Sequence, residues 1–450
     1  MTELCDLIEA ERVRAGVPGC AVVVVRDGHV ELCQGFGLRD VQSGAPVTAQ
    51  TLFPIGSSTK TFAAALAARL ALAGLVDLDA PLSSYQPEVG LLDPDASAQL
   101  SLRDCLSHRS GLPRHDLLWL GSGGRVDRDQ LVRAVAHLPL NEPFRSTYQY
   151  NNLLYIVAGH VLGGLAGGTF EEVLHREVLD PLHMERSTFV SADALLDPDR
   201  ATPYDHGPRE MPFVPLDLAG PAGGLISCAA DLSMWLLALA GEGPALSEMR
   251  TACIARSTLD PQGPFSDTAY GLGLMLETYR GHAVSHHGGN IDGFSAQVLT
   301  RDDGVGIAVL TNLHTTSFRD ALPYLVLDHL DGVPPQDHAG FFAERLHRTM
   351  APLRDRQAPV PAPSSEGAEL IGRYRHPGYG EIGVELSDAG LRWSYQGSDQ
   401  GVLVVRGEDL EAHYRFFGVD LCAAGTTTNG GLALQLEPTV PPIPFTRTSL

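Results

Sequence analysis

The chain contains a single lysine, and this lysine stands three residues after a serine. Lys60 is the only lysine in the sequence, so the remaining 31 of the 32 Lys and Arg residues are arginines. An ammonium group can lose its proton when it is taken out of water, whereas a guanidinium effectively cannot. A protein that otherwise uses arginine for positive charge, yet keeps one lysine beside a serine, indicates a site that needs a neutral amine as a base.

Ser57-x-x-Lys60 directly precedes a long apolar, alanine-rich stretch at 61–75, which predicts a helix buried on nearly all sides. Residues three apart at the start of a helix share a face, so the hydroxyl and the amine can come within hydrogen-bond reach. A serine becomes a nucleophile when a base takes its proton, and a helix N-terminus favours the charge of a tetrahedral intermediate. A phosphate-binding loop does not fit, because Thr59 rather than glycine precedes the lysine.

A second polar group, Tyr150-Asn151-Asn152, stands at the entry of another predicted helix at 153–165. A phenol can relay a proton between a nucleophile and a leaving group when nearby cations favour its ionised form. An asparagine side chain can hold a substrate amide. Taken alone, this pattern is more typical of a helix cap followed by a core tyrosine, so its weight depends on the other motifs.

The third candidate is a pair of histidines followed by a pair of glycines. His286 is a candidate substrate contact, and Gly288 and Gly289 would allow a ligand to approach the backbone closely. Paired histidines can indicate a metal site. However, adjacent residues of a strand point to opposite faces, and the sequence lacks an H-E-x-x-H pattern. We therefore expect no metal and no cofactor.

These groups must be positioned by the surrounding helices and strands. The sequence pattern predicts one sheet built from both ends of the segment 1–350. Near the N-terminus, a β-branched run, a turn signal at Asp27-Gly28 and a returning run indicate a hairpin. The expected elements are a helix at 3–14, strands at 20–25, 29–35, 283–285, 294–300 and 306–311, and helices at 321–330 and 341–353. From about 80 to 270 the pattern is mainly helical, so helices would cover the sheet in a layered α/β or α+β architecture.

The C-terminal part has a different pattern. The stretch QAPVPAPSSEG at 357–367 is rich in Pro and Ser and predicts a linker. We place the domains at 1–352 and 368–450, with the linker at 353–367. Short runs with turn residues between them predict a small antiparallel barrel or sandwich. These runs lie at 370–374, 382–386, 391–395, 402–405, 412–416, 432–436 and 443–445.

Composition restricts the partners and the compartment. The net charge of −22 disfavours nucleic acid and anionic membranes as partners. The N-terminal stretch is amphipathic and acidic rather than a secretory signal, and no apolar run is long enough to span a bilayer. The 7 cysteines are scattered without a C-x-x-C pair, which is typical of reduced, buried thiols. We expect a cytoplasmic protein.

In this order, Ser57-x-x-Lys60, Tyr150-x-Asn152 and His286-x-Gly288 resemble the motifs of penicillin-binding-protein-like serine hydrolases. This group holds class C β-lactamases, D-aminopeptidases, D-alanyl-D-alanine carboxypeptidases and related esterases. Secondary stretches at 102–113, 221–232 and 270–273 are also similar to that family, and the resemblance covers roughly residues 5–335. It implies an α+β fold class, with a β-lactamase-like or transpeptidase-like domain whose antiparallel sheet is flanked by helices and which carries a helical subdomain at about 80–270.

The resemblance also implies a role for each matching residue. Ser57 would be the acylated nucleophile, with Lys60 as its base. Tyr150 would serve as general acid or base for the leaving group and the deacylating water, and Asn152 would contact the substrate amide. The backbone N–H groups of Ser57 and Gly289 would form the oxyanion hole.

Two positions depart from the family pattern. His286 stands where β-lactamases and many penicillin-binding proteins have the lysine of K-T-G. A fixed cation there would help to bind a β-lactam or peptide carboxylate, and a neutral histidine does so less well. Asn151 replaces the usual small residue between Tyr150 and Asn152. Both departures favour a peptidase or esterase over a β-lactamase.

The C-terminal part resembles the lipocalin-like barrel that follows this hydrolase domain in some D-amino-acid-tolerant peptidases. The stretches at 374–380 and 436–440 carry this resemblance. It implies a domain that limits access to the site, sometimes from a neighbouring subunit, which allows for a homo-oligomer. A barrel whose interior is simply packed by side chains is an equally good interpretation.

The hypothesis that follows is a serine hydrolase that forms an acyl-enzyme and acts on short peptides, including peptides with D-residues. An esterase or a weak β-lactamase, acting on small acyl esters or β-lactams, is the alternative within the enzyme class. A catalytically silent binding or sensor protein, with the barrel as its ligand module, is the alternative of another class. The intact Ser57, Lys60 and Tyr150 count against it.

Overall fold

The contacts within the chain divide it into two compact units. The computed structural model describes residues 2–257, 263–354, 357–360, 366–388, 390–416 and 419–449. The first unit comprises Met1–Asp79 and Ala158–Arg348, and the second comprises Ala80–Val157 and Thr349–Leu450. The segment 80–157 therefore groups with the C-terminal part of the chain. The domain boundaries at 352 and 368 stay a prediction.

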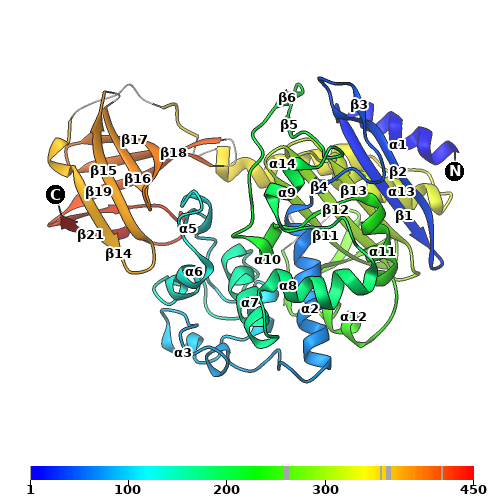
Figure 1. The fold of residues 1–450 in the computed structure, drawn as a ribbon, viewed down its shortest axis with the longest axis horizontal. Helices are drawn as coiled ribbons and strands as arrows, with labels where there is room; N and C mark the ends of the chain where they lie inside the picture. Colours follow the sequence, from blue (N-terminus) through cyan, green and yellow to red (C-terminus); the bar gives the residue numbers. More distant parts are fainter. Residues whose placement is uncertain are drawn as a thin grey trace. The chain divides into compact units, whose positions relative to one another are not determined.

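The first unit is built on one antiparallel sheet (Figure 1), whose strand order is β3-β2-β1-β13-β12-β11-β10-β9-β8. The strands are β1 Gly19–Arg26, β2 His29–Asp40, β3 Ala45–Pro46, β8 Ile254–Ala255, β9 Phe265–Tyr270, β10 Met275–Tyr279, β11 His282–Ile291, β12 Phe294–Arg301 and β13 Gly306–Thr311. The N-terminal hairpin joins the late strands directly, because β1 pairs with β13 from Cys20↔Thr311 to Val25↔Gly306. The predicted sheet from both ends of the segment is confirmed.

Four strands of this sheet fall outside the prediction, and one of them is the 2-residue β3. Strands β8 and β9 belong to the region expected to be mainly helical, and β10 follows it. β8 has only 2 residues, and β9 reads FSDTAY with exposed polar residues at its centre. Neither strand shows the apolar alternation that identifies a strand from sequence. Their place at the sheet edge depends on pairing, of β9 with β10 and of β8 with β9.

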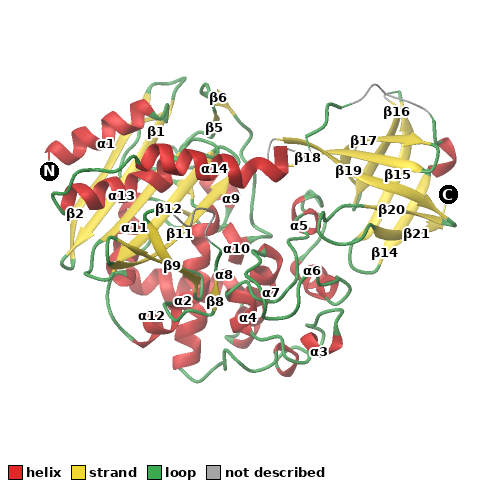
Figure 2. Cartoon of the chain, turned by 180° about the vertical axis from the view of Figure 1, so that it is seen from behind, coloured by secondary structure: helices red, strands yellow, loops and turns green. Residues whose placement is uncertain are grey.

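Helices cover both faces of the sheet because its central strands are apolar on both sides. β1 reads GCAVVVVR and is buried along almost its whole length, as strands between two helical layers are. Figure 2 shows α1 (Thr2–Arg14), α13 (Phe318–Leu330) and α14 (His338–Arg354) across one face. On the other face, α11 (Ala229–Leu239) contacts β1 and β13. The short elements of this unit are η1 Gly56–Ser58, β4 Phe53–Pro54, β7 Ile226–Ser227, β5 Tyr204–Asp205, β6 Arg209–Glu210, α8 Phe170–Leu174, η3 His175–Leu179, η4 Asp180–Leu182, α9 Ser191–Leu196, α10 Gly220–Gly223 and α12 Pro244–Met249.

The predicted buried helix after the serine is α2, Thr59–Leu72. Eleven of its residues are buried, from Thr59 to Leu70, and this run includes the lysine. The helix ends near the predicted place, where Leu72 and Leu75 are more than half exposed. The predicted burial on nearly all sides therefore holds for most of α2, and only its last turn is exposed.

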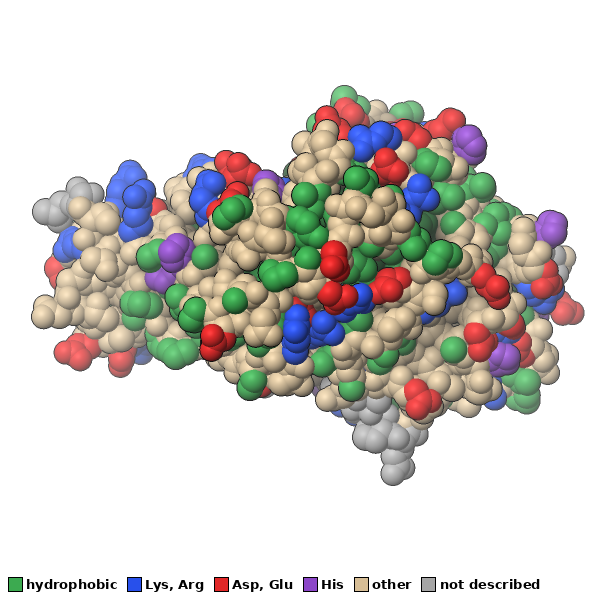
Figure 3. Space-filling model, turned by 90° about the horizontal axis from the view of Figure 1, so that it is seen from below, with side chains coloured by type: hydrophobic (Ala, Val, Ile, Leu, Met, Phe, Trp, Pro, Cys, Tyr) green, Lys and Arg blue, Asp and Glu red, His purple; other side chains and the backbone are tan. Residues whose placement is uncertain are grey.

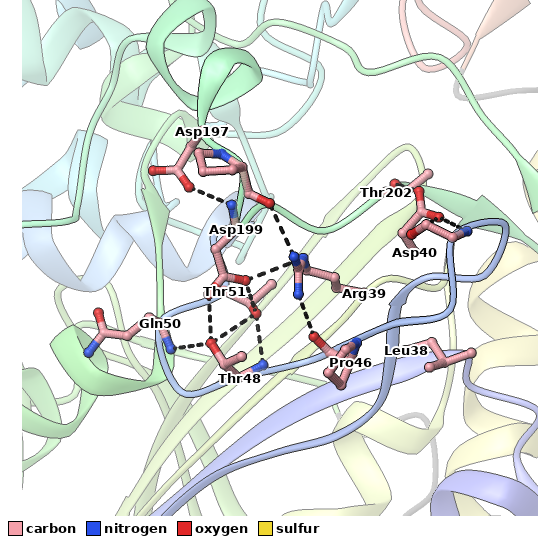
Figure 4. A network of polar contacts seen from close by, with 12 residues as sticks. Leu38, Arg39, Asp40, Pro46, Thr48, Gln50, Thr51, Asp197, Asp199 and Thr202 are labelled. Carbon is pink, nitrogen blue, oxygen red and sulfur yellow. Dashed lines mark hydrogen bonds and ion pairs between the residues drawn. The ribbon is translucent and has the colours of Figure 1, made fainter.

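A polar network holds the segment that leads into η1 (Figure 4). Asp199 accepts hydrogen bonds from the hydroxyls of Thr48 at 2.7 Å and Thr51 at 2.6 Å, and it pairs with Arg39 at 3.5 Å. Backbone hydrogen bonds continue the contact, since Leu52 N donates to Asp199 O at 2.8 Å. The chain therefore enters β4 and η1 from an anchored turn.

The second unit holds a closed barrel and a group of short helices. The barrel strands are β14 Gly372–His376, β15 Gly380–Ser387, β16 Gly390–Tyr395, β17 Ser398–Arg406, β18 Asp409–Phe416, β19 Val419–Thr428, β20 Gly431–Leu434 and β21 Ile443–Ser449. The predicted small antiparallel barrel is confirmed, with β19 as a strand that the sequence pattern does not indicate. The helices are η2 Leu82–Ser84, α3 Pro94–Ser97, α4 Leu102–Leu106, α5 Leu117–Leu120, α6 Arg128–Val135 and η5 Ala368–Leu370. Helix α7, Asn152–Leu165, continues from this unit into the first.

Surface charge and helix length are two further properties of the chain. On the face drawn in Figure 3, acidic and basic side chains lie interspersed with apolar and uncharged ones.

Within the described residues, no single helix has the length and apolar character needed to cross a membrane. Only the bent pair Asn152–Leu165 and Phe170–Leu182, with 71° between its halves, meets that test, by length and composition alone.

Candidate active site

Ser57 and Lys60 lie in hydrogen-bond contact at the junction of η1 and α2. The Lys60 Nζ donates to the Ser57 Oγ at 3.0 Å and to the Ala222 carbonyl at 2.5 Å. The lysine side chain is fully buried. The second bond fixes the direction of the amine, because Ala222 belongs to the neighbouring α10. The geometry matches the pairing of nucleophile and base expected from the three-residue spacing.

Hydroxyl groups on either side of the serine hold this turn in place. Thr59 Oγ1 donates to the Gly56 carbonyl at 2.7 Å and accepts from Leu225 N at 3.2 Å. Ser58 Oγ donates to the His287 carbonyl at 3.0 Å, which links η1 to β11. Serine and threonine bind nearby backbone groups readily, so the run Ser-Ser-Thr before the lysine is used to fix the backbone.

Two glycines allow η1 and β11 to lie in backbone contact. A Cβ at Gly289 would stand 1.8 Å from the Ile55 carbonyl oxygen and 2.9 Å from Ser57 N. Gly56 has a φ of 51°, and a Cβ there would meet Asn290 N at 2.9 Å. A residue with a side chain fits at neither place. The backbones of Ser57 and Gly289, whose N–H groups the family resemblance assigns to an oxyanion hole, therefore lie side by side.

The two histidines of β11 have different surroundings. His286 Nδ1 lies 3.1 Å from Gln297 Nε2, and His286 Nε2 lies 3.5 Å from Glu277 Oε2. His287 is hydrogen-bonded to the Tyr270 hydroxyl at 3.0 Å. Burial holds the pKa of His287 well below its ordinary value, so this ring is neutral at neutral pH. The substrate contact expected of His286 stays a prediction.

The Arg319 guanidinium lies against the backbone of Gly288 and Gly289. Its Nη1 donates to the Gly289 carbonyl at 2.5 Å and to the Ala296 carbonyl at 3.1 Å. A Cβ at Gly288 would lie 2.9 Å from the same nitrogen. Gly288 therefore makes room for the guanidinium, and its expected contact with substrate stays a prediction.

In the second unit, Tyr150 lies between an imidazole and a guanidinium. The His108 ring centroid is 4.4 Å from that of Tyr150, and the Arg114 guanidinium carbon is 5.2 Å from the Tyr150 centroid. The His108 and Tyr150 rings are tilted by 36° to each other, and this contact together with the cation–π contact restricts the plane of the Tyr150 ring. The sequence patterns do not indicate either partner.

Asn151 caps α7, as a structural interpretation of this motif predicts. Its Oδ1 accepts from Leu154 N at 2.8 Å, and its Nδ2 donates to the carbonyls of Leu112 at 3.1 Å and Pro113 at 2.5 Å. The residue between the two site candidates is therefore larger than in the family pattern because it ties this segment to the loop at 111–116.

Asp116 is the other polar centre of this unit. Its Oδ1 accepts from Asn152 Nδ2 at 3.2 Å and from Trp119 Nε1 at 3.0 Å. Its Oδ2 accepts from Arg114 Nε at 2.5 Å. A loop that carries Arg and Asp two residues apart after Gly-Leu-Pro is the sequence signal for this pair, although its spacing does not identify the partner.

The candidate residues are thus placed in two groups. Ser57, Lys60, His286 and the two glycines belong to the first unit, and Tyr150 and Asn152 belong to the second. That the two groups act together is a prediction based on the family resemblance.

Gly289→Ala is expected to destabilise the protein by about 3 kcal/mol or more, because the added methyl overlaps the Ile55 carbonyl. Gly164→Ala is the matched control. It adds the same methyl in α7 where nothing lies within 4 Å, so it should leave stability unchanged or raise it. Denaturant unfolding measures both variants. Equal stability of Gly289→Ala and the wild type would contradict the close approach.

Glu277→Gln should cost stability in a pH-dependent way. Burial would raise the pKa of Glu277, but contacts with His286, Arg345 and Arg256 lower it to about 2. An unfolded glutamate titrates near pH 4.3, so the folded carboxylate contributes stability above that pH and loses it as the pH falls toward 2. We expect a loss of roughly 2–3 kcal/mol at pH 7 that shrinks below pH 4.

The control for this prediction is Glu31→Gln, which removes the partly exposed pair with Arg26 in the same sheet. Exposed pairs contribute less than about 1 kcal/mol, so this variant should show little pH dependence. Denaturant unfolding between pH 3 and pH 7 measures both variants. A pH-independent loss in Glu277→Gln would show that the charge of the carboxylate is not what matters.

Comparison with known proteins shows the family of the chain. A family model described as Beta-lactamase matches residues 5–331. The unguisins hydrolase ungD of Aspergillus violaceofuscus is 29% identical over 424 residues, which cover 83% of this chain and 74% of that protein. The octameric penicillin-binding protein homologue from Pyrococcus abyssi has a TM-score of 0.64 at 22% identity and covers 99% of both chains. The D-stereospecific amidohydrolase from Streptomyces sp. has a TM-score of 0.57 at 25% identity, over 70% of this chain and 94% of its own. Because the family model spans well over half of the sequence, the chain belongs to the Beta-lactamase family.

Proposed function

We propose that the protein is a serine hydrolase that works through an acyl-enzyme on Ser57. The observation that carries the proposal is the 3.0 Å contact between the Ser57 hydroxyl and the buried Lys60 amine, next to the backbone of Gly289. A nucleophile in contact with a base, with backbone donors nearby, is the arrangement that acyl transfer requires.

In the proposed mechanism, Ser57 Oγ attacks the substrate carbonyl carbon while its proton passes to Lys60 Nζ. The backbone N–H groups of Ser57 and Gly289 bind the oxyanion that forms on the carbonyl oxygen. The C–N or C–O bond then breaks, and Tyr150 gives the leaving group a proton. In the second half of the reaction, water attacks the acyl-enzyme and loses a proton to the Tyr150 phenolate. The bond to Ser57 Oγ then breaks, and Lys60 returns its proton to this oxygen, which releases the acid and restores all three side chains.

The substrate that we propose is a short peptide or amide, including those with D-residues. The name of one relative, the D-stereospecific amidohydrolase, supports this class, and the name of the unguisins hydrolase supports a hydrolase. The sequence at this place also weakens a β-lactamase, because His286 stands where β-lactamases have the lysine of K-T-G and supplies no fixed cation.

The alternatives remain an esterase or weak β-lactamase and, in another class, a catalytically silent binding protein. We also propose a cytoplasmic location, on the basis of the scattered cysteines, and a homo-oligomer, because the homologue from Pyrococcus abyssi that resembles the whole chain is octameric.

The first experiment is labelling with a fluorophosphonate followed by peptide mass analysis. We expect one modified residue, Ser57, and no labelling of Ser57→Ala. Lys60→Arg keeps the charge but cannot act as a base, so its labelling rate should fall by about a thousandfold. Ser233→Ala, a buried serine of α11, serves as the control.

NMR gives a second measurement of the lysine. Because the chain has one lysine, 15N-lysine incorporation gives a single side-chain NMR signal, which should titrate at the same pH as the rate of fluorophosphonate labelling. Labelling that survives in Lys60→Arg at full rate would refute the role of the lysine.

The second experiment is a substrate panel of D- and L-aminoacyl anilides, p-nitrophenyl esters and a chromogenic cephalosporin. The proposal expects turnover of anilides, with D-residues accepted, and slower turnover of the cephalosporin. Hydrolysis of the esters alone would favour the esterase. Acylation of Ser57 without turnover of any compound would favour the silent binding protein.

A further inference from the structure

The barrel holds one loop of its own unit by two hydrogen bonds. His115 N donates to Glu437 Oε2 at 3.0 Å, and His115 Nδ1 is hydrogen-bonded to the Tyr379 hydroxyl at 2.8 Å. Tyr379 lies between β14 and β15, and Glu437 lies between β20 and β21. Figures 1 and 2 both show α5, which follows this loop, beside the barrel.

These two bonds are shielded from water. His115, Tyr379 and Glu437 are 1%, 0% and 7% exposed. Burial lowers the pKa of His115 to about 4, so the ring is neutral and shares one hydrogen with the phenol. The His115 backbone has a φ of 46°, a conformation that few residues other than glycine adopt. Buried polar groups are expensive to leave unpaired, so the contact fixes His115 in place.

The residues on either side of His115 contact the candidate site residues of this unit. Arg114 lies over the ring of Tyr150 at 5.2 Å. Asp116 accepts from Asn152 at 3.2 Å and binds Arg114 at 2.5 Å. Arg114 and Asp116, the chain neighbours of His115, therefore connect the barrel contact to the Tyr150 phenol and to the Asn152 amide.

Other contacts hold the barrel to the short helices independently of His115. Gln400 Nε2 donates to the Gly121 carbonyl at 2.7 Å. Gly378 lies against the backbone of α6, where a Cβ would stand 3.0 Å from the Ala134 carbonyl oxygen. Loss of one hydroxyl at position 379 therefore leaves the barrel attached and affects the loop alone.

We propose that Tyr379 and Glu437 are positioning residues for Tyr150 and Asn152, and that they act through His115. The inference rests on the proposed function, which gives the phenol and the amide their roles. Without the two bonds the loop can shift, and Arg114 and Asp116 shift with it. The barrel then serves catalysis by holding one side of the site in place, without touching the substrate.

The test compares Tyr379→Phe with Tyr374→Phe. Both substitutions remove one buried barrel hydroxyl that makes a single bond, since Tyr374 donates to the Leu370 carbonyl at 2.7 Å. Hydrogen exchange should be at least about twofold faster in peptides that cover 111–119 and 148–153 for Tyr379→Phe. Tyr374→Phe should leave these peptides unchanged. Equal exchange in the two variants would overturn the coupling.

Turnover of the best anilide from the panel gives the second readout. For Tyr379→Phe we expect kcat to fall about tenfold while KM changes less than about twofold, since a small misplacement of catalytic groups has large kinetic effects. Tyr374→Phe should keep the wild-type kcat. Faster exchange at 111–119 with an unchanged kcat would overturn the positioning role.

Glu437 supplies a rescue experiment. Glu437→Gln keeps an oxygen that can accept from His115 N, so it should retain most of kcat, whereas Glu437→Ala should resemble Tyr379→Phe. Equal loss in both Glu437 variants would overturn the role of this hydrogen bond. If the wild-type protein is not acylated at Ser57, the proposed function fails, and the exchange data still decide whether the barrel holds the loop.

Discussion

The backbone contact between η1 and β11 is the constraint on which the site depends. It exists because Gly289 has no Cβ, which would otherwise lie 1.8 Å from a carbonyl oxygen. The same condition holds at Gly56, and again at Gly273, where a Cβ would stand 2.5 Å from the Lys60 carbonyl. Three glycines thus surround the turn that carries Ser57. They set the distance between Ser57 and strand β11, and they allow α2 to begin with Lys60 fully buried.

A fully covered lysine is costly as a cation unless it is well paired. Lys60 donates to the Ser57 hydroxyl and the Ala222 carbonyl, which are uncharged oxygens that can accept from an ammonium or from an amine. An arginine could not exist there in a neutral form. This requirement explains why the position holds a lysine while the other 31 Lys and Arg residues are all arginines.

The parts of the structure that follow from short-range pattern could be predicted from the sequence. The hairpin of β1 and β2 has its turn residues, α2 has its apolar run, and Ser57 and Lys60 have helical spacing. Strands β8, β9 and β19 could not be predicted, because they are short or polar and form only by pairing with neighbours. The contacts of His115 with Tyr379 and Glu437 join residues 264 and 322 positions apart. No local periodicity encodes such a pair, and a lone histidine gives no sign of it.

The packing of the barrel bears on what this domain can do. Tyr374, Trp393 and Tyr395 are each about 1% exposed, and the Trp393 indole donates to the His413 carbonyl at 2.8 Å. An eight-stranded barrel is only wide enough to be filled by side chains or to hold one small ligand. A barrel that buries these aromatic groups matches the first case, which weakens the alternative in which it is a ligand module. Its polar contacts with His115 come from the connections between strands, where Tyr379 and Glu437 lie. A packed barrel is stiff, and stiffness is the property that a support for a catalytic loop requires.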